Sequence, residues 1–121
     1  MAEHNETGKL GEELAKEYLA GKGFAIIATN FQSGKNEIDL ICKDGETLVF
    51  VEVKTRHSDF LVEPEFAVTR KKQNSIIKAA NQYITAEDLD VESRFDIISV
   101  IIYPDHNEIE HIDNAFMPIV K

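Results

Sequence analysis

A carboxylate and an ammonium group, Glu52 and Lys54, end a segment that is otherwise apolar, residues 47–54. A run this rich in valine and phenylalanine is typical of a central strand covered on both faces. Because side chains alternate along a strand, the two charges share a face, with Cα atoms about 7 Å apart. Burying either charge costs free energy. The two residues are therefore either an ordinary strand end emerging into solvent or part of a site.

A second carboxylate, Asp39, is brought to the same place by the preceding strand. The strand over residues 37–42 alternates, and the Asp44-Gly45 dipeptide after it is the strong signal for a tight two-residue hairpin loop. With this turn, and to within a residue or two, Asp39 faces Phe50 and is a diagonal neighbour of Glu52, about 7–8 Å away at Cα. The sequence therefore predicts that the two carboxylates and the nearby lysine form one constellation.

Carboxylates gathered in this way repel one another, by about 4 kcal/mol at 4 Å and an effective dielectric constant near 20. The arrangement is stable only if one carboxyl is protonated or a cation lies between them. Hard oxygen ligands with open positions suit Mg²⁺, or Mn²⁺ as its substitute, which bind phosphate oxygens alongside one or two carboxylates. Such an ion activates a bound water and stabilises a phosphodiester transition state, and Lys54 could orient or deprotonate that water or neutralise the phosphate.

The charge pattern places the basic residues next to this constellation. The net charge of −9 argues against a protein that coats nucleic acid nonspecifically. Residues 54–78, however, hold six basic and three acidic side chains, a local footprint that suits one phosphate site. Arg70-Lys71-Lys72 opens a predicted helix, where the helix dipole disfavours cations unless an anion is bound. The alternative is three solvated surface charges.

The elements that must position these residues alternate between helix and strand. Helical periodicity, Thr7 as N-cap and Gly23 as C-terminal cap predict a helix over residues 7–22. Glu12 lies at the edge of its apolar face, so it either faces a site beside the core or is a solvated first-turn acid. The other expected elements are a strand at 24–28, a loop at 30–36, strands at 37–43 and 46–54, a long connection at 55–68, a helix capped by Thr69 and running to about Thr85, and strands at 94–103 and 108–111.

This order, α-β-β-β-α-β-β, predicts an α/β fold with a mixed sheet and helices packed on it. The strand after the second helix is expected to lie parallel to the strand that carries Glu52, through that helical crossover. The 121 residues suffice for one domain, 1–121, and are too few for two ordinary ones.

Composition excludes several other classes of protein. Hydrophobic and charged contents of 43% and 29% are those of a soluble globular protein. The polar, acidic start is no secretory signal and no stretch approaches the roughly 18 apolar residues of a membrane span, so a cytoplasmic protein without a membrane partner is the simplest fit. The single cysteine, Cys42, excludes an internal disulfide and a cysteine-based zinc cluster, and the histidines lack ligand spacing.

Asp39 followed by Glu52-Val53-Lys54 13 residues later resembles the PD-(D/E)XK nuclease signature. More closely, five blocks over nearly the whole chain resemble the uncharacterised YraN-like family of predicted endonucleases. These blocks are Gly8-x-x-Gly11-Glu12-x-x-Ala15, Glu37-Ile38-Asp39-Leu40-Ile41, Phe50-Val51-Glu52-Val53-Lys54-x-Arg56, Ala67-Val68-x-x-x-Lys72 and Arg94-Phe95-Asp96. The chain departs from that family at Asn36, where glycine is common, and by lacking a glycine near residues 61–62.

The resemblance implies a restriction-endonuclease-like three-layer fold and a relationship to archaeal-type Holliday-junction resolvases. It also implies that Glu12, Asp39, Glu52 and Lys54 form the active-site set. In that set Asp39 and Glu52 hold Mg²⁺, and Glu12 supports them from the first helix.

Three hypotheses follow for function. The first is a Mg²⁺-dependent endonuclease acting on branched, flapped or otherwise structured nucleic acid, with DNA as the expected partner. The second is a non-catalytic nucleic-acid-binding module on the same scaffold, with Arg56, Arg70, Lys71 and Lys72 as phosphate contacts. The third, a protein-interaction domain, is favoured only by the acidic balance. A subunit this small covers little substrate, which favours a symmetric homodimer for paired cuts.

Overall fold

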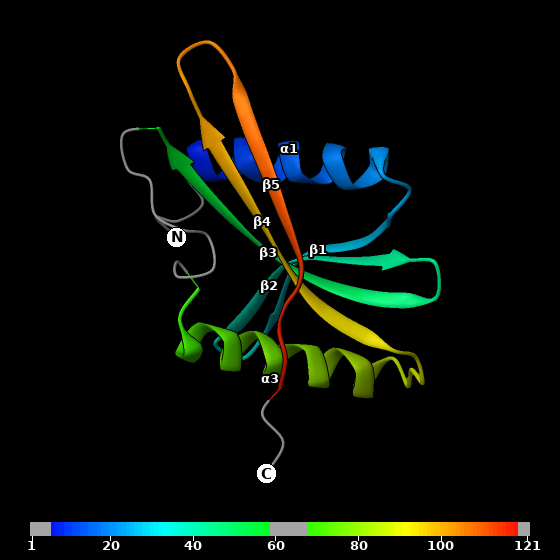
Figure 1. The fold of residues 1–121 in the computed structure, drawn as a ribbon. Coiled ribbons are helices and arrows are strands. Elements are labelled where there is room, and N and C mark those ends of the chain that lie inside the picture. Colours follow the sequence, from blue (N-terminus) through cyan, green and yellow to red (C-terminus); the bar gives the residue numbers. More distant parts are fainter. Residues whose placement is uncertain (1–5, 59–67, 119–121) are drawn as a thin grey trace.

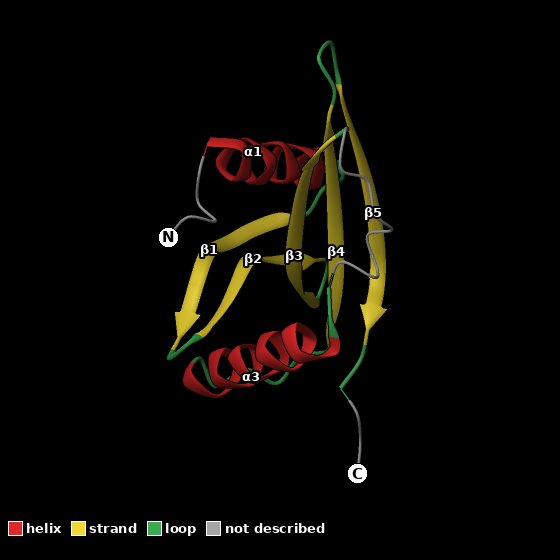
Figure 2. Cartoon of the chain, turned by 90° about the vertical axis from the view of Figure 1, so that its left-hand side faces the viewer, coloured by secondary structure: helices red, strands yellow, loops and turns green. Residues whose placement is uncertain are grey.

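Residues 6–58 and 68–118, the part of the chain that this computed structural model describes, form one five-stranded sheet with a helix on each face (Figure 1). Figure 2 shows the sheet between the two helices. The elements in chain order are α1 (Glu6–Gly21), β1 (Ala25–Ser33), β2 (Asn36–Asp44), β3 (Thr47–His57), α3 (Arg70–Ala86), β4 (Ser93–Ile102) and β5 (Asn107–Phe116). The predicted order of helices and strands is confirmed, and most of the expected connection 55–68 lies outside the described residues.

The strands lie in sequence order, β1-β2-β3-β4-β5, with one parallel pair at the centre. β3 and β4 are parallel, with Glu52 beside Ile97, as expected for two strands joined through a helical crossover. The other neighbouring pairs are antiparallel. Because β3 is central and covered on both faces, its apolar residues are buried up to Glu52, and the strand becomes half-exposed from Val53 onward.

The turn between β2 and β3 differs from its prediction. Asp44 pairs with Thr47, so the two loop residues are Gly45 and Glu46 rather than Asp44 and Gly45. Gly45 has φ +63°, and a glycine at the first loop position suits the type II′ turn, whose twist matches that of the strands. The register therefore differs by two residues from the predicted one, and Phe50 pairs with Ile41 instead of Asp39.

Both edge strands are longer than predicted. The expected loop at 30–36 is wrong, because β1 continues to Ser33 and turns tightly so that Ser33 pairs with Asn36. The turn residues in this segment are accommodated by positive φ angles at Asn30 and Gly34, and a register shift between Ile26 and Ala28 comes before the segment. β5 continues to Phe116 instead of ending near residue 111, because its pairing with β4 outweighs the weak strand preference of Asp113 and Asn114.

Each helix covers its own half of the core. The α1 side holds the buried residues Ala15, Leu19, Phe24, Leu40, Cys42, Val49, Val51, Ile98 and Val100. The α3 side holds Ile38, Ile41, Leu48, Phe50, Val68, Ile76, Ala79, Ala80, Phe95, Ile97 and Phe116. Neither helix in the described part of the chain is long and apolar enough to cross a membrane.

The helix termini depend on specific local contacts. The Thr69 hydroxyl accepts a hydrogen bond from the Lys72 backbone N–H (3.1 Å), which confirms Thr69 as the N-cap of α3. Thr7 lies inside α1 instead of capping it, and a hydrogen bond joins its hydroxyl to His57 Nε2 (3.2 Å). Gly23, with φ +94°, follows the end of α1 as expected for a left-handed C-terminal cap.

Candidate functional site

The hairpin of β2 and β3 brings Asp39 and Glu52 together on the face that α3 covers. The ladder between these strands runs from Asp44–Thr47 to Leu40–Val51, so its next step would set Asp39 opposite Glu52. At that step the Asp39 carboxylate takes over the hydrogen bonding, and its Oδ2 accepts from the Val53 backbone N–H at 2.8 Å. The expected proximity of the two carboxyl groups is therefore confirmed, although through a different register.

Burial makes the charged forms of both carboxyl groups unfavourable. Glu52 is only 5% exposed, and burial, followed by the negative charge of Asp39, raises its pKa to about 8. Burial also raises the pKa of Asp39, although the hydrogen bond from Val53 and the positive charge of Lys72 oppose this effect. The two carboxyls are close enough to share a hydrogen bond, which requires that one of them carries a proton. Without a cation, the pair therefore favours a single negative charge near neutral pH.

The polar atoms of Glu52 are incompletely satisfied. Its Oε1 is buried without a hydrogen-bond partner among the described residues. The Nζ atom of Lys72 on α3 lies 4.0 Å from the other oxygen, Oε2. A buried carboxylate oxygen without a donor is costly, and native structures rarely keep one without a reason. A ligand that binds this oxygen would remove the cost of leaving it unpaired.

Two more charged side chains belong to the surroundings of the pair. Lys54 is half-buried and lies two residues beyond Glu52 on the same face of β3. Burial, Asp39 and Lys72 have larger effects on the pKa of Glu52, but the positive charge of Lys54 also lowers it. Glu37 is two residues before Asp39 on β2, and its negative charge contributes to the raised pKa of Asp39, behind burial. The sequence prediction omitted Glu37 from the site, although strand alternation would have placed it on the same face.

The other predicted site residues lie on α1, further along β3 and in the first turn of α3. Glu12 is on α1, where its Oε1 accepts a hydrogen bond from the Asn30 side chain on β1 (3.4 Å). Its place in the active-site set stays a prediction. Arg56 continues the face of Lys54 along β3 and is half-buried, whereas Arg70 and Lys71 are exposed in the first turn of α3. These basic side chains thus come from two elements, β3 and α3.

The donor set fits a hard divalent cation. Asp39 and Glu52 offer carboxylate oxygens only, including the Oε1 atom that lacks a donor, and Mg²⁺ is commonly held by one or two carboxylates while waters and phosphate oxygens complete its shell. No group of three or more histidine, cysteine or acidic side chains is placed to hold a metal within residues 6–58 and 68–118. The fit is therefore to an open two-carboxylate site, and not to a closed structural site.

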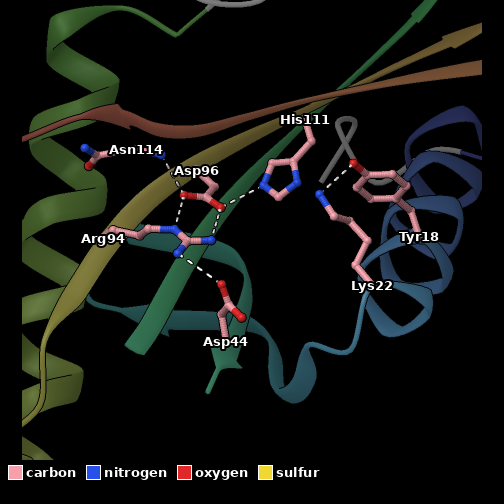
Figure 3. A network of polar contacts seen from close by, with 7 residues as sticks. All are labelled: Tyr18, Lys22, Asp44, Arg94, Asp96, His111 and Asn114. Carbon is pink, nitrogen blue, oxygen red and sulfur yellow. Dashed lines mark hydrogen bonds and ion pairs between the residues drawn. The ribbon is translucent and has the colours of Figure 1, made fainter. Parts of the chain in front are cut away.

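A second buried carboxylate, Asp96, lies on the α1 side of the sheet (Figure 3). Its Oδ2 is bonded to His111 Nε2 (2.7 Å) and its Oδ1 accepts from Arg94 Nε (3.0 Å) and from the Asn114 backbone N–H (2.9 Å). Arg94 also donates to Asp44 at the β2–β3 hairpin (3.2 Å). Burial would raise the pKa of Asp96, but these hydrogen bonds outweigh it and lower that pKa. The Arg-Phe-Asp block therefore builds a satisfied polar network.

His111 is the residue of this network that the sequence did not reveal. Its ring meets the rings of Tyr18 and Phe24 edge-on, at centroid distances of 5.6 and 5.9 Å. The network thereby joins α1, β4 and β5 (Figure 3). The predicted strand 108–111 includes His111, but no register was predicted for its pairing with β4, so nothing placed His111 beside Asp96.

Comparison with known proteins gives one consistent result. The model of a family described as uncharacterised protein family UPF0102 matches residues 11–100. A UPF0102 protein of Christiangramia forsetii is 47% identical over 96% of this chain and 98% of its own length. UPF0102 proteins of Porphyromonas gingivalis and Geobacter sulfurreducens are 42% and 47% identical, over 100% and 93% of this chain and 91% of their own lengths. The chain belongs to the uncharacterised protein family UPF0102.

Proposed function

We propose that this protein is a Mg²⁺-dependent endonuclease with a restriction-endonuclease-like fold, acting on branched or flapped nucleic acid. The observation that carries the proposal is the Asp39–Glu52 pair. Two carboxyls with raised pKa values lie close enough to affect one another, and a buried oxygen of Glu52 lacks a donor among the described residues. Such an arrangement costs stability in the metal-free protein. A cation bound between the two groups would remove that cost.

Each residue has a role in the proposed reaction. Asp39 and Glu52 bind the cation, and Val53 fixes the Asp39 carboxylate through its backbone N–H. The bound ion would supply an activated water and stabilise negative charge on the phosphate. Lys54, on the same face of β3, orients or deprotonates the water or neutralises the phosphate. Glu12 supports the site from α1.

The charge distribution favours a compact phosphate site over a long duplex track. The chain carries a net charge of −9, so most of its surface repels nucleic acid. The proposed phosphate contacts are the basic residues of β3 and of the first turn of α3, Arg56, Arg70, Lys71 and Lys72. A protein that holds only a short length of backbone suits a substrate defined by its shape, such as a branch or flap. A homodimer would allow two such sites to make paired cuts.

The test is cleavage of labelled forks, flaps, four-way junctions and single strands with Mg²⁺ or Mn²⁺, comparing the wild type with Asp39→Asn and Glu52→Gln. Both variants keep the size of the side chain and are expected to abolish cleavage while the circular dichroism spectrum is retained. Glu46→Gln, in the exposed β2–β3 turn, is the matched control and should cleave like the wild type. Equal cleavage by Glu52→Gln and wild type would refute the proposal.

The exposed basic first turn of α3 favours one alternative, a non-catalytic nucleic-acid-binding module. In that case Arg56, Arg70, Lys71 and Lys72 bind phosphates and the carboxylate pair is dispensable. Binding to a junction would weaken steeply with salt and with charge reversal at Arg70 or Lys71. It would be unchanged in Glu52→Gln, and no substrate would be cut with either metal ion.

A further inference from the structure

Lys72 differs from the two basic residues that precede it on α3. Its ammonium group lies 4.0 Å from Glu52 Oε2, and its charge is felt by both carboxyls of the pair, opposing the effect of burial on each pKa. Arg70 and Lys71 are exposed on the same helical turn. Successive helical residues are about 100° apart, so Lys71 points to a different side of α3. Lys72 is therefore the basic residue of this turn that is aimed at the carboxylates.

The contact between Lys72 and Glu52 is nevertheless loose. A charge-assisted hydrogen bond has a length of about 2.7–2.9 Å, whereas this N–O distance is 4.0 Å. The Lys72 side chain is 44% exposed against 6% for Glu52. Glu52 Oε1 still lacks a donor among the residues that the structure describes. The ammonium group thus balances charge without satisfying the oxygens. A divalent ion carries twice that charge and binds oxygens at about 2.0–2.1 Å.

We propose that Lys72 is the exchangeable counter-charge of the Asp39–Glu52 pair. It balances the pair in the metal-free protein, and a divalent ion that binds to the pair displaces its ammonium group. This inference rests on the proposed function, since it requires the pair to be a metal site. Lys72 is then a positioning residue that lowers metal affinity. Once displaced, its flexible side chain is released beside Arg70 and Lys71, where a substrate phosphate can bind it. Metal binding would therefore complete the phosphate contact.

The test is a Mn²⁺ titration followed by electron paramagnetic resonance, with Lys72→Met, Lys72→Arg and Lys71→Met. Lys72→Met removes the competing charge but preserves the helix cap, because the cap uses the Lys72 backbone N–H. We expect its Kd for Mn²⁺ to fall about tenfold, which corresponds to about 1.4 kcal/mol. Lys72→Arg keeps the charge and should bind like the wild type. Lys71→Met makes the same change in net charge at an exposed position and controls for long-range electrostatics.

The outcomes separate this inference from the proposed function. Tighter binding in Lys72→Met than in Lys71→Met, lost when Asp39→Asn is added, supports both. Equal affinities in these two variants, with binding still dependent on Asp39 and Glu52, overturn the role of Lys72 and leave the metal site standing. Weaker binding in Lys72→Met also overturns it, because Lys72 would then help to hold the ion. If neither the wild type nor Lys72→Met binds Mn²⁺, both proposals are wrong.

Discussion

Asp96 and Glu52 are buried carboxylates on opposite faces of the same sheet, and their surroundings differ sharply. Asp96 is fully buried and bonded to Arg94, His111 and the Asn114 backbone (Figure 3). Glu52 is 5% exposed, lies near the carboxyl of Asp39, and has one oxygen without a donor among the described residues. For Asp96 the hydrogen bonds outweigh burial and lower the pKa, whereas for Glu52 burial and Asp39 both raise it.

The difference shows that burial alone does not identify a functional carboxylate. A buried charge surrounded by hydrogen-bond donors holds those donors in place, because removing the charge would leave each of them unpaired in the interior. A buried charge without enough donors costs stability, and such groups cluster at functional sites. The Asp96 network is therefore interpreted as structural, and the Asp39–Glu52 pair as the candidate site. The two interpretations predict opposite effects on stability when the carboxylate is removed.

The largest effect is expected from Asp96→Ala. This change leaves Arg94 without its buried acceptor and His111 without its partner, and breaking a buried ion pair typically costs about 3–5 kcal/mol. The free energy of unfolding, measured by urea denaturation at neutral pH, should fall by that amount. Asp90→Ala, at an exposed position, should change it by less than about 0.5 kcal/mol. A loss below about 1 kcal/mol in Asp96→Ala would contradict the interpretation of the Asp96 network as structural.

The sequence predicted one of these two regions better than the other. Strand alternation and a short hairpin were enough to bring Asp39 near Glu52, because both residues lie within a few positions of one turn. The register was still wrong by two residues, since the positive φ of Gly45 moved the turn by one position. The Asp96 network needs His111, which lies beside Asp96 because of the β4–β5 register, in which His111 pairs with Ile98, and that register was not predicted.

The helical contacts were predicted unevenly for a similar reason. Thr69 was identified as the N-cap of α3 because capping is a local property of the sequence. The approach of the Lys72 side chain to Glu52 was not predicted, and this residue was assigned only to phosphate binding. That approach depends on how the crossover helix docks on the sheet, a tertiary relation that no local signal in the sequence specifies.

A smaller loss of stability is expected from Gly11→Ala. Gly11 is buried where α1 crosses β3, and an added methyl group would overlap the hydroxyl and the carbon atoms of Thr55. Overpacking of this kind costs about 1–3 kcal/mol. It should push α1 away from the sheet and loosen the contact of Tyr18 with His111, so the free energy of unfolding should fall.

The matched control for this helix is Gly21→Ala. No atom lies within 4 Å of the position that its added methyl group would take. Because alanine favours a helix more than glycine does, this variant should be neutral or up to about 1 kcal/mol more stable. If Gly11→Ala were as stable as Gly21→Ala, the close packing of α1 on β3 would not contribute to the stability of the α1 side of the sheet, where the Asp96 network lies.

The property that separates the two carboxylates most directly is the pH dependence of stability in the metal-free protein. Because the folded-state pKa of Glu52 is about 8, above its usual 4.5, the folded protein binds more protons than the unfolded chain between these values. Glu52 should therefore lower the free energy of unfolding as the pH rises through this window, by at most about 1.4 kcal/mol per pH unit. Asp96 acts in the opposite sense. Its folded-state pKa lies below 3.8, so its contribution is fully present above that pH and is lost in more acidic solution.

Glu52→Gln removes the first of these effects and keeps the second. In the presence of a chelator, this variant should equal the wild type near pH 4, and its advantage in stability should grow with pH up to pH 8, by at most about 1.4 kcal/mol per pH unit. The measurement is a series of urea denaturation curves from pH 4 to pH 9, with Glu46→Gln as the control for a change in net charge. A wild-type slope that persists in Glu52→Gln would assign the titration to another group. Glu52 would then be as well satisfied as Asp96, and the reason for placing a cation beside it would be gone.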